Sequence, residues 1–576
     1  MLFNVSNPPR DRTLAGVSRR SNQGIALVLA GMLLAACSSD SEPEGKPGFF
    51  SSILPGSEER EKPRSIILES GLVFFGVATG DEPNAVIAAE EMLKFGGTAV
   101  DAAVSLALTM TVTMPSSVSL GGGGVCIVHD PGRKKTEVID FIAPPGTPNA
   151  SADRPSAVPT LLRGLAAMHV RYGRADLRGI LATAEKKARF GHVVSRATAL
   201  EMALAEKPLF QDPATRQIFA RADGKSYAEG DRLIQLDLAD TLAALRTGGI
   251  AGFYKGPLAE RMVTAAQDAG GTLTLEDLRN YIPKWRDAVA IAYEDKVVTF
   301  APSPAGAGVG GGLMWNMLSD QGRFKGATGD VRAHLLLEAA KRAFAARQPW
   351  LSPTGSDKAD SVFADPKRAA TLMADFDPQA ATPASRLEPA PVVLRENPAG
   401  TGFVVVDLVG LSVACTLTNY NLFGTGRVAP GMGVILAAAP GNGDRNALSL
   451  GPVLAYDAEF RSFYSAVAGS GGAAALTATL AVAADLIMQD LSLDKAISAP
   501  RVHHGGLPDV AVLEETVPEG VKASLRQKGH KTVVVPSLGR VNAAECPLGL
   551  DSSSETVVCF VVADPRGSGI AAESER

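Results

Sequence analysis

The sequence lacks an excess of basic residues. Lys and Arg number 56 against 61 Asp and Glu, which gives a formal net charge of −5 over 576 residues. Nucleic-acid partners require a basic surface, so this balance argues against one. Apolar residues make up 46% of the chain, which indicates a folded protein and not a disordered one. The length exceeds the roughly 250–300 residues at which single cores stop growing, so more than one lobe or layer is expected.

Cysteine is scarce, and its spacing matches no metal site. The five cysteines are Cys37, Cys126, Cys415, Cys546 and Cys559, and none forms a ligand pattern with a histidine. We therefore expect no metal and no cofactor. Cys546 and Cys559 are the closest pair and could form a disulfide. Cys126 and Cys415 lie in apolar, strand-like runs, and buried free thiols are the simpler expectation for them.

No apolar run near the N-terminus is long enough to span a membrane. Residues 1–23 carry four arginines against one acid, and residues 24–36 are uncharged and apolar. This run falls short of the roughly 20 residues that a spanning helix needs, so a signal peptide is expected. It ends in Leu-Ala-Ala-Cys, which resembles a bacterial lipoprotein signal with Cys37 as the lipidated residue. An ordinary secretory signal is the alternative, and the export route, general or twin-arginine, stays open.

A lipid anchor on Cys37 would place the chain in the bacterial cell envelope. The Ser-Ser pair that follows favours the outer membrane, with the protein facing the periplasm. Residues 37–66 are rich in Ser, Pro, Gly and charge, which is typical of a flexible tether. Domain assignment therefore begins with a signal at 1–36 and a tether at 37–66.

The rest of the chain alternates helix-like and strand-like patterns, which predicts layered α/β architecture. The expected elements are helices over 83–112, a strand pair at 125–128 and 136–141, mostly helix over 157–285, an exposed segment over 346–399, strands from 403 onward, a helix near 473–489 and a last strand at 556–562.

The glycine-rich loops match no nucleotide-binding pattern. Residues 121–124 lack the Lys and Ser/Thr of a phosphate-binding loop, and residues 306–312 lack the context of a dinucleotide site. Residues 468–472 read Ala-Gly-Ser-Gly-Gly and do not form a nucleophile elbow. These loops therefore indicate only that backbones approach closely there.

Several ordered blocks resemble the γ-glutamyltranspeptidase family over about residues 70–576. The matching blocks are Gly96–Ala103, Leu120–Gly124, Gly270–Leu278, Phe423–Gly426, Ala499–His504 and Ala563–Arg566. The resemblance implies an N-terminal-nucleophile hydrolase fold, a four-layer αββα sandwich of the α/β (α+β) class. It implies a large-subunit-like region at 67–399 and a small-subunit-like region at 400–576. Members of the family cut themselves to expose a Thr, whose own α-amine acts as its general base.

This sequence departs from the family pattern at the nucleophile and substrate-binding positions. The small subunit of the family begins Thr-Thr-His, whereas this chain reads Gly400-Thr401-Gly402. The nucleophile position is Gly400, which has no hydroxyl, and Thr401 is the candidate replacement. Ile142 stands in place of the Arg that holds the glutamyl carboxylate, and Tyr420 in place of an Asn.

Other positions of the implied site are retained. Thr418 and Ser449 keep their hydroxyls, and the amides of Gly471 and Gly472 would form the oxyanion hole. Thr418, Ser449 and Tyr420 are therefore the candidate catalytic and substrate-binding residues beside Thr401.

Two hypotheses follow. In the first, the chain is a catalytically degenerate relative that is retained as a binding or scaffold lipoprotein. In the second, it cuts itself between Gly400 and Thr401 and acts on glutathione or another amide. Either way, the implied ligand is a small amide or peptide, and the oligomeric state stays open. A single band on a denaturing gel favours the first hypothesis, and two fragments favour the second.

Overall fold

The computed structural model describes residues 65–67, 74–346, 364–388, 399–441, 447–554 and 556–575. The predicted signal at 1–36, its Cys37 and nearly all of the 37–66 tether lie outside these residues. Among the described residues, no helix is long and apolar enough to cross a membrane.

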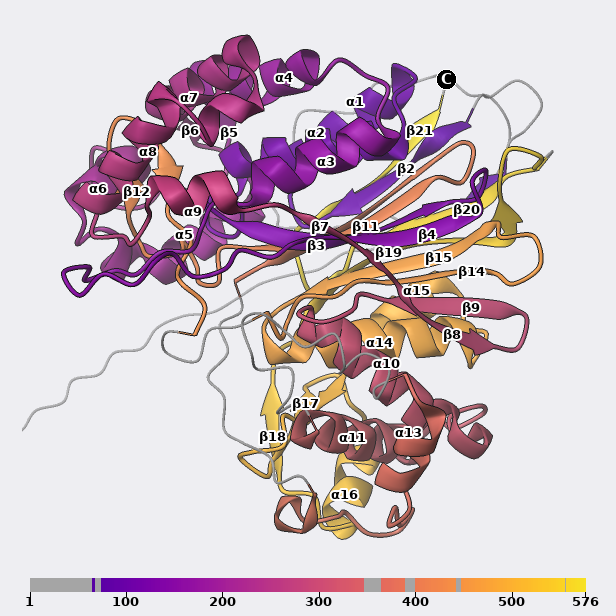
Figure 1. Cartoon of the computed structure of the whole chain (residues 1–576). Coiled ribbons are helices and arrows are strands. Elements are labelled where there is room, and N and C mark those ends of the chain that lie inside the picture. The colour runs from indigo at the N-terminus through magenta and orange to yellow at the C-terminus, as the bar shows by residue number, and fades with distance from the viewer. Residues whose placement is uncertain are drawn as a thin grey trace, which may run out of the picture. The chain divides into compact units, whose positions relative to one another are not determined.

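Two seven-stranded sheets form the centre of the fold (Figure 1). We call them the β10 sheet and the β15 sheet. The β10 sheet has the order β21-β2-β10-β11-β3-β4-β7, and its strands are β21 (Ile570–Glu575), β2 (Phe74–Gly80), β10 (Thr401–Asp407), β11 (Ser412–Thr418), β3 (Gly123–Asp130), β4 (Lys135–Phe141) and β7 (Lys284–Asp287). The β15 sheet has the order β1-β20-β19-β15-β14-β9-β8, and its strands are β1 (Ser65–Ile67), β20 (Val558–Val562), β19 (Arg540–Leu550), β15 (Phe463–Ser470), β14 (Val453–Asp457), β9 (Lys296–Phe300) and β8 (Val289–Tyr293).

Helices cover the outer face of each sheet (Figure 1). On the β10 sheet they are α1 (Pro83–Lys94), α2 (Ala99–Thr113) and α3 (Leu161–Tyr172), with α4 (Leu177–Phe190), α5 (Arg196–Leu209), α6 (Pro213–Phe219), α7 (Leu236–Gly248), α8 (Pro257–Asp268) and α9 (Leu275–Asn280) around them. On the β15 sheet they are α10 (Gly306–Ser319), α14 (Ala473–Ile487) and α15 (Leu493–Ser498), with α11 (Gly329–Ala345), α13 (Pro366–Leu372) and α16 (Glu519–Gln527) beyond. The predicted four-layer αββα sandwich is confirmed.

The composition of two helices explains why they occupy the inner positions. Helix α2 is apolar around its whole circumference, and all of its residues are buried. A capping box formed by Thr98 and Asp101 fixes its first turn. Helix α14 is rich in Ala, which allows it to pack closely against β15. Buried helices of this kind position the loops that precede them.

The two regions of the chain share both sheets. Strand β10 pairs with β2 on one side and with β11 on the other, and β11 pairs in turn with β3. The first region contributes β2, β3, β4 and β7 to this sheet, and the second contributes the remaining strands. The chain therefore forms one sandwich and not two separate lobes.

Two details of the sequence-based interpretation are wrong. The strand at 556–562 is not the last, because β21 follows it and pairs with β2. Strand β21 reads Ile-Ala-Ala-Glu-Ser-Glu, which shows no clear alternation of apolar and polar residues. Only its pairing in the sheet therefore reveals it as a strand. The segment 346–399 is not simply exposed, because Ala369 and Met373 are buried where α13 packs against α10.

The four described cysteines form two disulfides. Cys546 and Cys559 form the expected disulfide, between β19 and β20. Cys126 and Cys415 also form one, so the prediction of free thiols there is wrong. The register of β3 and β11 sets these two residues directly opposite each other, with their Cα atoms 4.1 Å apart. This second disulfide links the 67–399 region covalently to the 400–576 region.

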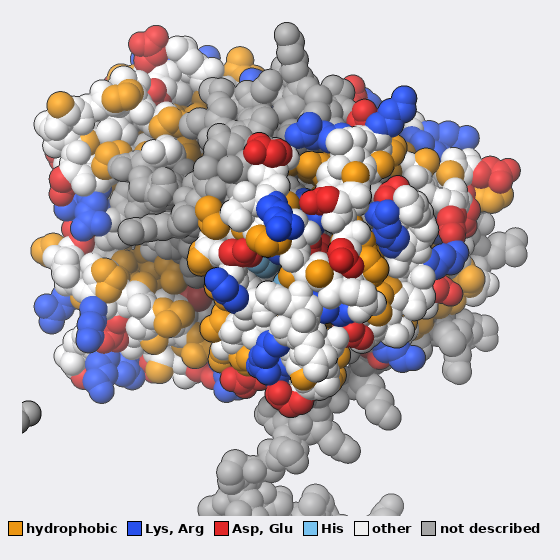
Figure 2. All heavy atoms as spheres, turned by 90° about the horizontal axis from the view of Figure 1, so that it is seen from below, with side chains coloured by type: hydrophobic (Ala, Val, Ile, Leu, Met, Phe, Trp, Pro, Cys, Tyr) orange, Lys and Arg blue, Asp and Glu red, His pale blue; other side chains and the backbone are white. Residues whose placement is uncertain are grey.

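The outermost layer, with α11, α13 and α16, carries a mixed surface. Figure 2 shows acidic, basic and apolar side chains interspersed on the face seen from below, without a broad area of one charge.

Candidate active site

Gly400 directly precedes β10 and faces Thr418. A Cβ placed on Gly400 would lie 3.9 Å from Thr418 Oγ1 and 3.2 Å from the carbonyl oxygen of Leu417. The Thr418 hydroxyl donates to the carbonyl of Ala399 at 3.0 Å and accepts from the Tyr420 amide at 2.8 Å. The residue that would carry a side chain toward Thr418 is thus a glycine.

Thr401 points the other way, into a buried polar cluster. Its hydroxyl donates to Asp81 Oδ2 at 3.0 Å, and Ser470 Oγ donates to the same oxygen at 3.0 Å. Asn542 donates to Asp81 Oδ1 at 2.9 Å. Thr401 is 1% exposed and Asp81 is 2% exposed. We call Asp81, Thr401, Ser470, Asn542 and the neighbouring Arg540 the Asp81 network.

Arg540 supplies the positive charge of the Asp81 network. Its Nε lies 3.8 Å from Asp81 Oδ2, and its Nη1 donates to Glu201 Oε1 at 3.1 Å. Burial lowers the pKa of Arg540, but the carboxylates of Asp81 and Glu201 outweigh it and raise the pKa above its ordinary value. Arg540 Nη2 also donates to the carbonyl of Gly400 at 3.4 Å. At the Gly400–Thr401 peptide bond, the carbonyl of Gly400 therefore contacts a guanidinium and the hydroxyl of Thr401 contacts a carboxylate.

The two sheets come very close beside this peptide bond. A Cβ on Gly402 would lie 2.7 Å from the backbone carbon and oxygen of Ala468, so no side chain fits there. Gly471 and Gly472 follow β15 and begin α14, with φ of 115° and 66°. Amides at a helix N-terminus suit a developing negative charge, and the oxyanion role of these glycines stays a prediction.

The predicted glutamyl-binding positions are filled by apolar packing. Ile142 is 8% exposed and belongs to the core between the sheets. Tyr420 is 5% exposed in the same core, and its hydroxyl donates to the carbonyl of Ala143 at 2.7 Å. Burial raises the pKa of Tyr420 above its ordinary value, so its phenol stays neutral. Both side chains face protein atoms, and neither offers a charge to a carboxylate.

Ser449 lies on the loop before β14 and is half-buried. The neighbouring Ala447 accepts a backbone hydrogen bond from Gly306 at the start of α10. Residues 442–446, which precede Ala447, are outside the described residues.

A second buried polar group lies beside α11, which we call the Glu338 cluster. It comprises Glu338, Lys341, Arg342, His334 and His530. Ligand atoms of the carboxylate and the two histidines lie within 4.8 Å of one another, the only such group of three among the described residues. However, both oxygens of Glu338 already pair with Lys341 and Arg342, and His334 Nδ1 lies 2.8 Å from His530 Nε2. A divalent cation would have to compete with two resident cations, so the cluster fits an ion-pair role.

Most of the chain matches one known family. The family model for γ-glutamyltranspeptidase covers residues 85–574. The chain belongs to the γ-glutamyltranspeptidase family. The similar curated proteins include the glutathione hydrolase proenzyme of Escherichia coli strain K12, 28% identical over 81% of this chain and 87% of that protein. The corresponding proenzyme of Pseudomonas aeruginosa is 29% identical over 75% of this chain and 83% of that protein.

Solved structures agree on the fold of this γ-glutamyltranspeptidase-family chain. A cephalosporin acylase from Bacillus halodurans superimposes with a TM-score of 0.76 and 23% identity, over 90% of this chain and 99% of the acylase. Identity at this level shows the fold alone, which is that of the N-terminal-nucleophile hydrolases.

Sequence reasoning did not find the residues around Thr401. These residues come from three distant parts of the chain, at Asp81, at Ser470 and at Arg540 with Asn542, and they match no short motif. The available signal was indirect: each is a polar residue at or next to the end of an apolar strand, where a side chain points between the two sheets.

Proposed function

We propose that this γ-glutamyltranspeptidase-family chain is a catalytically silent lipoprotein with a binding or scaffold role. The observation that carries the proposal is the pair of orientations at residues 400 and 401. The position that faces Thr418 is a glycine, and the hydroxyl of the next residue in the chain, Thr401, is turned away and bound to Asp81. Acyl transfer needs a nucleophile at the substrate pocket, and neither residue supplies one there.

The loss of charged ligands supports the same proposal. Ile142 and Tyr420 occupy the predicted glutamyl site as buried side chains without a charge. A carboxylate brought into such a site would lose its hydration without gaining a cation, which costs several kcal/mol. Glutathione and other γ-glutamyl compounds are therefore poor ligands of this site.

A second candidate is an active, self-processing amidohydrolase, and one set of contacts favours it. Thr401 Oγ1 donates to Asp81, which could accept its proton, while Arg540 donates to the carbonyl oxygen of Gly400. Attack of the Thr401 hydroxyl on that carbonyl would move the acyl group from nitrogen to oxygen, and water would then release Thr401 as a new N-terminus. The nearly complete burial of Thr401 disfavours a substrate at this position.

A denaturing gel distinguishes the two candidates, but only with a reductant. The disulfide between Cys126 and Cys415 would hold fragments 37–400 and 401–576 together, so a cut chain runs as one band without reductant. We expect one full-length band under reducing conditions, and the same result for Thr401→Ala. Two reduced bands in the parent chain and one in Thr401→Ala would overturn the silent assignment and support self-processing.

The envelope location is part of the proposal and rests on the N-terminal pattern ending at Cys37. The two disulfides support it, because such bonds persist in oxidising compartments outside the cytoplasm. Cells that express the chain and take up labelled palmitate should label it, and Cys37→Ser should abolish the label. An unlabelled parent chain, or a labelled Cys37→Ser variant, would contradict the lipoprotein assignment.

A further inference from the structure

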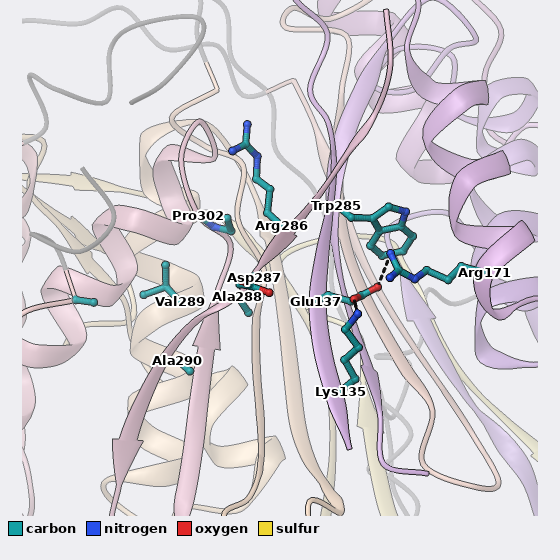
Figure 3. Close-up of a pocket in the computed structure, with 11 residues that line it drawn as sticks. Lys135, Glu137, Arg171, Trp285, Arg286, Asp287, Ala288, Val289, Ala290 and Pro302 are labelled. Atoms are coloured by element: carbon teal, nitrogen blue, oxygen red, sulfur yellow. Dashed lines mark ion pairs between the residues drawn. The ribbon is translucent and has the colours of Figure 1, made fainter. Parts of the chain in front are cut away.

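Between β7 and β8 the chain crosses directly from the β10 sheet to the β15 sheet. Strand β7 is the edge of the β10 sheet, β8 is the edge of the β15 sheet, and Ala288 alone joins them. A pocket of about 710 Å³ opens at this crossing. Figure 3 shows Lys135, Glu137, Arg171 and Trp285 on one side of it and Val289 and Ala290 on the other.

The outer side of β8 presents unpaired backbone. Among the described residues, β8 pairs only with β9, through a two-residue turn at Glu294-Asp295. Such a turn makes Tyr293 and Lys296 a hydrogen-bonded pair, so the backbone groups of Ala290 and Ala292 point away from β9. Edge strands usually carry a charge or a proline that blocks further pairing. Between Val289 and Tyr293 this strand has neither.

The opposite wall of the pocket joins two exposed cations to one buried carboxylate. The other charged lining residues are Asp287 and Arg286, and Arg286 pairs with Asp140 at 2.9 Å. Glu137 is 3% exposed, accepts from Tyr172 Oη at 3.0 Å and from Arg171 Nη1 at 2.9 Å, and also pairs with Lys135. One carboxylate thus serves two cations. The side chains of Lys135 and Arg171 remain 46% and 36% exposed, with N–H groups left to donate.

An aromatic wall accompanies these cations. The Arg171 guanidinium lies 4.4 Å from the centroid of the Trp285 ring, and Tyr172 meets the same ring edge-on. Stacking on Trp285 holds the guanidinium in place and leaves its other edge for an anion. Lys135 and Arg171 both contact Glu137 and approach it from different directions, as Figure 3 shows.

We propose that this pocket binds an extended peptide that bears a carboxylate. The peptide backbone adds to the outer edge of β8 at Ala290 and Ala292, and the carboxylate binds Lys135 and Arg171. The free strand edge argues for a peptide and not for a small anion alone, because a small anion would leave the edge unused. The charge on the opposite wall argues for an acidic peptide.

This pocket is separate from the candidate active site. Strand β7 lies four strand positions from β10, roughly 19 Å at about 4.8 Å per strand. No residue that lines the pocket belongs to the Asp81 network or to the predicted glutamyl site. The inference therefore holds whether or not the bond between Gly400 and Thr401 is cut.

The test is a titration of the full-length chain in detergent with the fluorescein-labelled peptide Ser-Val-Thr-Val-Glu, followed by fluorescence anisotropy. We expect saturable binding, weaker by about tenfold or more for the same peptide ending in Gln-amide, the scale of a lost charge-assisted contact. N-acetylglutamate should not compete at equal concentration. Equal binding of the amide peptide, effective competition by N-acetylglutamate, or no saturable binding would each overturn the proposal.

Two kinds of variant locate the site. Lys135→Gln with Arg171→Gln should weaken binding by about tenfold or more, whereas Arg178→Gln with Lys186→Gln, on exposed positions of α4, should not. Ala290→Pro removes an outward N–H from the edge and should weaken binding, whereas Ala290→Ser keeps it. Ala290→Pro leaves the Glu137 ion pairs intact, so it tests the proposal even if the double variant unfolds. Unchanged binding by Ala290→Pro would overturn the edge-pairing arrangement.

Discussion

The Asp81 network and the Glu338 cluster are both buried, yet they balance their charge differently. Glu338 is paired with two cations, Lys341 and Arg342, which are 1% exposed. Asp81 faces mainly neutral donors, with Arg540 at 3.8 Å shared with Glu201. The charge of Glu338 is balanced by ion pairs, whereas the charge of Asp81 is stabilised mainly by several hydrogen bonds.

We assign the two groups different roles. The Glu338 cluster stabilises the fold, whereas the Asp81 network is what is left of the family's active site. The first role follows because Lys341 of the Glu338 cluster joins α11 to the carbonyl of Thr382 at 2.6 Å. The Asp81 network surrounds the peptide bond at which a small subunit would begin. Loss of the family side chains at 400 and 402 leaves this network as interior packing, and its removal should cost less than removal of the Glu338 cluster.

The largest expected effect is that of Glu338→Gln. Burial raises the pKa of Glu338, but Lys341 and Arg342 outweigh it and lower the pKa to about 2, so the group is a carboxylate at neutral pH. Its neutralisation removes the buried carboxylate that two buried cations share and should destabilise the fold by about 3–5 kcal/mol. Thermal unfolding measures this.

The matched control is Asp375→Asn. Asp375 also pairs with Arg342, but its side chain is 59% exposed, so we expect only about 0–1 kcal/mol. Equal losses for the two variants would show that burial does not set the cost, and the comparison would fail.

The second largest expected effect is a loss of stability on acidification, which we attribute to His504 near the Glu338 cluster. Burial lowers the pKa of His504 to about 4, and Lys341 adds to the effect while Asp509 opposes it. The unfolded chain takes up this proton near pH 6.5 and the folded chain only near pH 4, so stability falls as pH drops between those values. The shift corresponds to as much as about 3 kcal/mol.

His504→Gln should therefore flatten the dependence of the melting temperature on pH between 6.5 and 4. His169→Gln is the contrasting variant, because hydrogen bonding to Asp101 raises the pKa of His169. The contribution of that histidine is fully present below pH 6.5 and is lost as pH rises above that value. Its loss should therefore lower the melting temperature by a constant amount between pH 6.5 and 4 and leave the slope there as in the parent chain. The same slope in both variants would show that His504 does not contribute as assigned.

The sheet contact beside the Asp81 network gives a smaller effect. Gly402→Ala places a Cβ 2.7 Å from the backbone of Ala468, so β10 and β15 must separate locally. We expect a loss of about 1–3 kcal/mol, measured by thermal unfolding. Gly520→Ala, in α16 with nothing within 4 Å of the new Cβ, should be neutral or slightly stabilising. A neutral Gly402→Ala would mean that the sheets are not in close contact there.

The layered architecture of the fold could be predicted from the sequence, but many side-chain contacts between distant strands could not. Ordered blocks predicted the sandwich, and an ungapped match assigned Gly400 to the nucleophile position. The disulfide between Cys126 and Cys415 was missed because 289 residues separate the two, and only strand register brings them together. Asp81 was missed for the same reason: its bond to Thr401 depends on β2 and β10 being neighbours. Local patterns reveal elements, but the partners of a buried polar group come from pairing between distant strands.

The smallest expected effect is that of Thr401→Val. It removes one of the three hydrogen bonds that neutral side chains donate to the Asp81 carboxylate, and Ser470 and Asn542 continue to donate. The expected loss is therefore about 1 kcal/mol by thermal unfolding. Thr247→Val, which removes an exposed hydroxyl bonded to the Ala243 carbonyl, should have almost no effect. If Thr401→Val instead removed an amidase activity present in the parent chain, Thr401 would be a nucleophile, and the Asp81 network would be active chemistry instead of interior packing.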